Sequence, residues 1–161
     1  MQRSLIAAAL ALGGVAFAPL AAAHVIVSPS AAPAGAYQTL AFKVGHGCAG
    51  SATTAITVQI PDGVASAKPM PKPGWTIVLA DAPARTVTWR GGPLPDAYYD
   101  EFVLQIKAPE TPGRLTFKVG QACETGRNDW AEAPGAGKFP APVLEVTPVA
   151  PAAGEHAGHH H

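Results

Sequence analysis

The chain has 161 residues, of which 48% are hydrophobic and 14% are charged, and this length suits a single folded domain. Its 11 basic residues balance its 11 acidic ones, so it lacks the excess of positive charge typical of proteins that bind nucleic acid or anionic lipid. Glycine and proline, 17 of each, are too few for a low-complexity disordered chain and predict a folded protein rich in turns.

The amino-terminal segment 1–23 has the layout of a secretory signal peptide. Arg3 precedes an apolar run that has no charged side chain and ends in three alanines. A membrane helix, the alternative, would need about 20 well-populated apolar positions, whereas this run is rich in alanine and is interrupted by Gly13-Gly14 and Pro19. A basic start, an apolar middle and a small-residue exit are typical of a cleaved signal. We therefore expect an exported protein, periplasmic or extracellular, with no stable membrane span after cleavage.

Cleavage after Ala23 would make His24 the first residue of the mature protein. An amino-terminal histidine can close a chelate ring on one metal ion with its α-amine and its imidazole Nδ1. The amine has a pKa of about 7.7–8.0 and the imidazole one of about 6.5, so both can lose their protons to a strongly binding metal near neutral pH. Cu(II) suits these two nitrogens best, because it prefers tetragonal nitrogen and oxygen ligands. The alternative is that histidine follows the cleavage site by chance.

Short segments of alternating apolar and polar residues follow, and their period of two predicts half-buried strands. They cover residues 40–44, 56–60, 75–79, 86–90, 101–107, 115–119 and 143–146. Turn-forming residues stand between them at 61–63, 69–74, 91–93 and 111–113. Seven or eight antiparallel strands predict an all-β, single-domain β-sandwich of the immunoglobulin or cupredoxin kind.

Five aromatic side chains on these strands are the expected core. They are Phe42, Trp75, Trp89, Phe102 and Phe117. We expect one domain over residues 24–147 and a disordered tail over 148–161, because the tail has nothing to bury. The tail carries four histidines that could form a weak, flexible metal site. They are His156, His159, His160 and His161.

Cys48 and Cys123 are the only cysteines. In an exported protein the oxidising compartment favours a disulfide between them. The alternative is a soft site for Cu(I) with His46 as a third ligand, although the chain has no Cys-x-x-Cys motif. The disulfide is our prediction, and His46 is then a loop residue rather than a ligand.

A carboxylate could complete copper coordination at the amino terminus. Asp100-Glu101 is the densest acidic pair and opens a predicted strand, in which alternation turns Glu101 away from the buried face, so a solvated carboxylate is the alternative. Trp130 lies in the polar segment 123–134, which lacks strand alternation. It either caps an edge of the sandwich or forms the wall of a binding site. Glu132, close to it in sequence, is a second candidate carboxylate.

Six short motifs are spread along nearly the whole predicted domain. They are His24-Val25 with Ser28-Pro29, His46-Gly47-Cys48, the proline-rich 71–75, the glycine-proline stretch 91–95, the Tyr-Asp-Glu-Phe stretch 99–102 and the segment 121–130. Together they resemble the YcnI-like domain of secreted bacterial copper-binding proteins. The combination is specific, although no single motif is.

The resemblance implies a β-sandwich that holds one Cu(II) in a mono-histidine brace. In such a site the amino-terminal amine and imidazole bind the metal, a glutamate supplies an oxygen and a tryptophan packs beside it. Carried over by position, His24 gives both nitrogens, Glu101 is the glutamate and Trp130 is the tryptophan. Glu132 is the competing carboxylate.

The resemblance further implies a copper chaperone or acquisition factor of the cell envelope, which works beside other copper-handling proteins and has no catalytic turnover. Two alternatives stay open. A copper-dependent redox enzyme of the polysaccharide monooxygenase type would need a second histidine, and His46 is the candidate within the domain. An envelope β-sandwich that binds a protein partner and no metal would make His24 coincidental.

Overall fold

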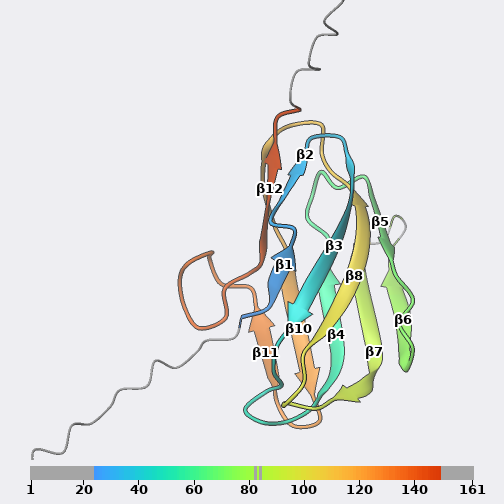
Figure 1. Cartoon of the computed structure of the whole chain (residues 1–161), viewed down its shortest axis with the longest axis vertical. Coiled ribbons are helices and arrows are strands. Elements are labelled where there is room, and N and C mark those ends of the chain that lie inside the picture. Colours follow the sequence, from blue (N-terminus) through green and yellow to red (C-terminus); the bar gives the residue numbers. More distant parts are fainter. Residues whose placement is uncertain (1–23, 82, 84, 150–161) are drawn as a thin grey trace, which may run out of the picture.

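A computed structural model describes residues 24–81, 83 and 85–149 of the chain. These residues form twelve β-strands in three sheets and no helix (Figure 1). The predicted all-β sandwich is confirmed. The predicted signal peptide 1–23 and the four tail histidines lie outside the described residues. Within the part of the chain that is described, no helix has the length and hydropathy needed to cross a membrane.

The first sheet has four antiparallel strands and receives the amino-terminal end of the described chain. Its order is β1 (Ile26–Ser28), β3 (Tyr37–Val44), β8 (Asp100–Lys107) and β5 (Ser66–Pro69). Along β8, Phe102, Leu104 and Ile106 are fully buried, and Glu101 lies on the other face, as the alternation predicts. Because β1 begins two residues after His24, the sheet fixes the region in which His24 lies.

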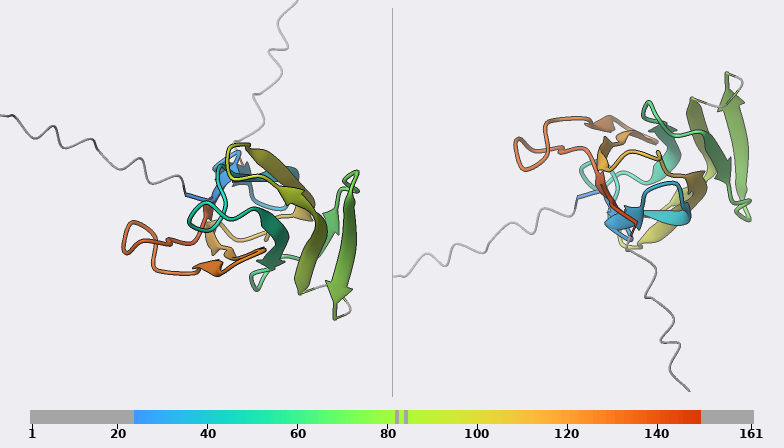
Figure 2. Two further views of the ribbon diagram at one scale, coloured as in Figure 1. Left: turned by 90° about the horizontal axis from the view of Figure 1, so that it is seen from below. Right: turned by 90° about the horizontal axis from the view of Figure 1, so that it is seen from above.

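The second sheet has five antiparallel strands. Its order is β11 (Arg127–Trp130), β10 (Lys118–Cys123), β4 (Thr53–Gln59), β7 (Thr86–Leu94) and β6 (Trp75–Ala80). Ile56 and Val58 of β4 and Val87 and Trp89 of β7 are fully buried and face the first sheet across the core. Seen end-on, β6 lies at the outer edge of the molecule (Figure 2).

A smaller third sheet closes one end of the sandwich. In it β2 (Ala31–Pro33) pairs in parallel with β12 (Val143–Thr147), and β12 pairs antiparallel with β9 (Gly113–Thr116). Phe117 lies between β9 and β10 and is fully buried, so the crossing from this sheet to the second is anchored in the core. In Figure 1 the third sheet is at the top, and the hairpin of β10 and β11 points to the bottom.

The core is aromatic, as predicted. Phe42, Trp89, Phe102 and Phe117 are fully buried, and the rings of Phe42 and Phe117 meet edge-on at 5.3 Å. Trp75 is only partly buried, because β6 is an edge strand, and it packs against the cluster from the side.

The strand predicted over 115–119 is a first correction, because it is divided at Phe117 between β9 and β10, which belong to different sheets. Four short strands go beyond the predicted set. They are β1, β2, β5 and β11, each of three or four residues, too short for a period of two to be visible in the sequence. β11 lies in segment 123–134, whose sequence lacks strand alternation. It is an edge strand whose conformation follows from pairing with β10 rather than from an apolar pattern.

The Gly91-Gly92-Pro93 stretch is a second correction, because it lies inside β7 rather than in a turn between strands. Gly91 and Gly92 have positive φ values of 149° and 80°, which bend the strand without ending it. A Cβ at Gly91 would lie 2.2 Å from the carbonyl oxygen of Gly74, so only glycine permits this close approach of β6 and β7.

The Phe102 ring should be the most sensitive point of the core, because Trp75 and Trp89 both pack on it, at 4.9 and 5.7 Å. We expect Phe102→Ala to lower the free energy of unfolding by about 3–5 kcal/mol through lost contacts and a residual cavity. Tyr99→Ala, at a ring that is 67% exposed, should change it by about 0.5 kcal/mol or less. Urea unfolding followed by circular dichroism measures both. Equal effects of the two substitutions would contradict this description of the core.

Candidate metal centre

Trp130 brings two histidines to one place in the fold. The ring of His24 lies 6.1 Å from the Trp130 ring at an interplanar angle of 81°, and the ring of His46 lies 6.1 Å from it at 63°. His24 precedes β1, His46 follows β3 and Trp130 ends β11, so three segments distant in sequence meet beside the edge of the second sheet (Figure 1). Trp130 is 2% exposed, whereas His24 is exposed and His46 is half-buried. The result is a buried indole in contact with two more accessible imidazoles.

A buried glutamine holds Trp130 and the His46 backbone in fixed positions. Gln121, on β10, is 1% exposed. Its Oε1 accepts a hydrogen bond from Trp130 Nε1 at 3.0 Å, and its Nε2 donates to the carbonyl oxygen of His46 at 2.7 Å and to Thr53 Oγ1 at 2.9 Å. A buried polar group left unpaired costs about 1–3 kcal/mol, so the bonds favour one arrangement of these groups.

The sequence interpretation missed Gln121. The sequence does contain a sign of its role. Gln121 lies two residues after the buried Val119 on β10, so both side chains point to the inward face of the strand. A polar residue at such an inward position indicates a buried hydrogen-bond network.

The loop after His46 is tied to the second sheet by a covalent bond. Cys48 and Cys123 form a disulfide with a Cα–Cα distance of 6.0 Å, as predicted. Cys48 and Ser51 pair through two backbone hydrogen bonds of 3.0 Å each, which closes a tight turn between them. The loop therefore has little freedom to carry His46 away from Trp130.

Gly47 and Asp96 fix the same loop from another side. The Gly47 amide donates to Asp96 Oδ1 at 2.8 Å. A Cβ at Gly47 would lie 1.8 Å from the carbonyl oxygen of Ser51, so no larger residue fits. Of the His46-Gly47-Cys48 motif, Gly47 and Cys48 thus have structural roles that set the position of His46.

The imidazole of His46 also contacts its own loop. Its Nδ1 lies 2.5 Å from the carbonyl oxygen of Gly47, and a carbonyl oxygen can only accept a hydrogen bond, so Nδ1 is the donor in this contact.

Glu101 lies on the outward face of the first sheet. It stands opposite Lys43 in the ladder, and Lys43 in turn stands opposite Ile26 of β1. The Glu101 carboxylate pairs with the Lys43 ammonium at 3.4 Å. Among the described residues, no group of three or more His, Cys, Asp or Glu side chains could hold a metal ion. A role of Glu101 as a ligand therefore stays a prediction.

Glu132 organises the loop that follows Trp130. Its Oε2 accepts a hydrogen bond from the Phe139 amide at 2.7 Å, and its carbonyl oxygen accepts one from Ala141 at 3.0 Å. These bonds close the loop and bring the Phe139 ring edge-on to Trp130 at 5.1 Å. Glu132 thus has a structural role in this structure, and Phe139 is a third aromatic neighbour of Trp130 besides the two imidazoles.

An open hollow of about 480 Å³ lies beside His46. Its polar lining includes Asp96, Asn128 and Lys138 as well as His46 itself. The imidazole can therefore be reached from solvent at this edge of the sandwich.

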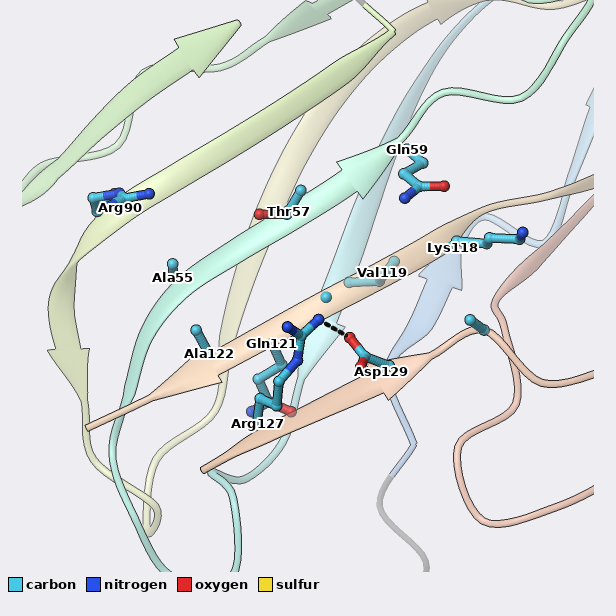
Figure 3. A pocket seen from close by; sticks show the side chains of 12 residues that line it. Ala55, Thr57, Gln59, Arg90, Lys118, Val119, Gln121, Ala122, Arg127 and Asp129 are labelled. Atoms are coloured by element: carbon cyan, nitrogen blue, oxygen red, sulfur yellow. Dashed lines mark hydrogen bonds and ion pairs between the residues drawn. The ribbon is translucent and has the colours of Figure 1, made fainter. Parts of the chain in front are cut away.

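A second hollow, a trough of about 440 Å³, lies on the outer face of the second sheet (Figure 3). Small residues line it, namely Ala55, Thr57, Gly120 and Ala122. Arg90, Lys118 and Arg127 surround it, and the hydrogen bond and negative charge of Asp129 raise the pKa of Arg127. No histidine or cysteine lines this trough.

The contacts of Gln121 predict a large effect from one substitution. Gln121→Met keeps the approximate size of the side chain but leaves Trp130 Nε1 and the His46 carbonyl without their partner. We expect the free energy of unfolding to fall by at least about 2 kcal/mol. Gln59→Met, at an exposed position of β4, is the matched control and should change it by about 0.5 kcal/mol or less. Guanidinium unfolding measures both, and an unchanged midpoint for Gln121→Met would refute the network.

Comparison with known proteins agrees with this architecture. A crystal structure of an uncharacterized protein from Nocardia farcinica, which has an immunoglobulin-like fold, superposes with a TM-score of 0.67 at 29% sequence identity, covering 76% of this chain and 97% of that one. A search of curated proteins gives no match. A family described as a domain of unknown function, DUF1775, matches residues 24–85 and 80–146. The chain therefore belongs to the DUF1775 family, which is the YcnI-like family that its motifs resemble.

Proposed function

We propose that this protein is an exported copper-binding protein that takes up one Cu(II) at its amino terminus and passes it to other copper-handling proteins of the cell envelope. His24 provides two nitrogens, the α-amine released by signal cleavage and the imidazole, and Glu101 is the proposed carboxylate. Copper is its cargo, and the proposal includes no catalytic turnover. The proposed location is the periplasm or the extracellular space.

The observation that carries the proposal is the contact between His24 and Trp130. The predicted first residue of the mature chain is exposed, yet its ring lies against a buried indole. This gives the terminal imidazole a defined place beside an apolar wall, where solvent is excluded from one side of a bound ion. Membership of a family whose match begins at residue 24 also supports it.

The donor chemistry fits Cu(II). An amine and an imidazole on one residue form a chelate of two nitrogens, which suits the tetragonal preference of this ion. The exposure of His24 suits a carrier, because an incoming ligand of a partner can reach the metal and replace the protein ligands one at a time. The Gln121 bond to Trp130 keeps the wall in place while His24 releases its cargo.

Copper titration tests the proposal. The protein should be the mature chain with the four tail histidines replaced by alanine, so that the tail contributes no sites. We expect one equivalent of Cu(II) to bind tightly, and we expect His24→Ala or a Gly-Ser-Gly-Ser extension before His24 to weaken binding by about 100-fold or more, because either change destroys the chelate. Competition with a chelator of known affinity measures this, and tight binding that survives both changes would exclude the amino-terminal site.

Tryptophan fluorescence tests the position of the metal. Bound Cu(II) should quench the emission of Trp130, the only tryptophan ring among the described residues that contacts His24. Trp130→Phe should therefore remove most of the quenching, whereas Trp75→Phe, on the far strand of the same sheet, should retain it. Equal quenching of the two variants would show that copper does not bind beside Trp130.

A further inference from the structure

We propose that the trough on the outer face of the second sheet is a docking site for an extended, acidic segment of a partner protein. The trough is the hollow of about 440 Å³ that Figure 3 shows from close by. Neither His24 nor Glu101, the residues proposed to bind copper, lines it. Docking at this face therefore goes beyond the proposed function and does not depend on it.

Small residues form the floor of the trough. Ala55 of β4 stands opposite Ala122 of β10, and Thr57 stands opposite Gly120. Because positions two residues apart on a strand face the same side of the sheet, these four residues form one outward-facing block in the middle of the sheet. Longer side chains from the flanking strands surround the block, so the floor is lower than the rim (Figure 3).

Gly120 is a residue that the fold itself does not require. It is absent from the glycines with a positive φ, and a Cβ there would meet Thr57 Cβ at 3.8 Å and Asp129 Oδ1 at 3.9 Å, which are ordinary contacts. Glycine inside a strand weakens it, because glycine loses the most conformational freedom on folding and has no side chain to pack. Such a glycine is typical of a place that a ligand or another backbone approaches closely.

Positive charge lies at both ends of the trough. Arg90 of β7 and Arg127 of β11 flank the end formed by Ala55 and Ala122. Lys118 lies at the other end, four residues before Ala122 on β10. Four residues of a strand span about 13 Å, and an extended segment laid along the trough covers the same length. Acidic side chains at its first and fifth positions would therefore each meet positive charge.

Most of this charge is not neutralised by the protein. Arg127 is paired with Asp129. Within the described part of the chain, by contrast, neither Arg90 nor Lys118 has a carboxylate at ion-pair distance, and both side chains are exposed. Complementary charge steers a partner and sets its orientation. The separation of the charges favours an extended polypeptide over a compact anion, which would meet only one end.

An NMR titration of the mature protein with a short peptide tests the proposal. The peptide has blocked termini, glutamate at its first and fifth positions, and glycine and serine between them. At millimolar concentration it should cause saturable shifts in the backbone amide signals of β4 and β10, and added salt should weaken binding. The matched control peptide has glutamine in place of both glutamates and should bind about fivefold more weakly or worse, because it lacks both charges.

Variants of the protein locate the site. Arg90→Gln and Lys118→Gln should each weaken binding of the acidic peptide by about two- to fivefold, because each removes the charge at one end. Lys68→Gln, at an exposed position of β5 in the first sheet, removes the same charge elsewhere and should leave the affinity unchanged. Gly120→Val should fill the floor and abolish binding without lowering the urea midpoint, because valine suits a strand better than glycine does.

The outcomes are decisive in either direction. Equal binding of the two peptides, shifts confined to other strands, or no shift at millimolar peptide would overturn the proposal. Inorganic phosphate that causes the same shifts as the peptide would also overturn it, in favour of a compact anion. If Gly120→Val folds poorly, the two charge variants and the control peptide still decide. All these measurements are made without copper, so failure of the amino-terminal copper site would leave them intact.

Discussion

The side-chain amide of Gln121 is the interaction on which the candidate site depends. One buried group accepts a hydrogen bond from the Trp130 indole and donates to the His46 backbone and to Thr53. It thereby links the edge strand β11, the central strand β4 and the loop that leaves β3. Without it, the edge strand would be held at this end mainly by its ladder with β10, and the indole would have an unpaired N–H in the core.

The site combines a rigid part with an adjustable one. The rigid part is the Trp130 indole and the loop of His46, which the Gln121 hydrogen bonds and the Cys48–Cys123 disulfide tie to the second sheet. The adjustable part is the exposed His24, which the first sheet carries. Under the proposed function, the fixed part would position the ion, and the exposure of His24 would let the ion enter and leave.

Much of the fold could be predicted from the sequence, because alternation directly reports which side chains are buried in longer strands. The buried Phe102, Leu104 and Ile106 of β8 are an example. Short edge strands such as β11 could not be predicted, since pairing with a neighbour determines them and leaves no periodic pattern. The disulfide could be predicted from the compartment and the cysteine count alone.

The candidate site could be predicted only in part. The importance of His24 follows from its position after the predicted cleavage site, which is a local property of the sequence. The proximity of His46 to Trp130 depends on how β1, β3 and β11 meet at one edge, and no local pattern contains that information. The ion pair of Glu101 with Lys43 likewise follows from the register of β3 and β8.

The disulfide also has a consequence for when the site can exist. Under the proposed function, removal of the leader creates the amine of His24, and an oxidising compartment creates the bond that anchors the His46 loop to the second sheet. Both covalent events belong to export, and neither takes place in a reducing cytoplasm. The newly made precursor would therefore lack a complete binding site, and the protein would not compete for copper inside the cell that synthesises it.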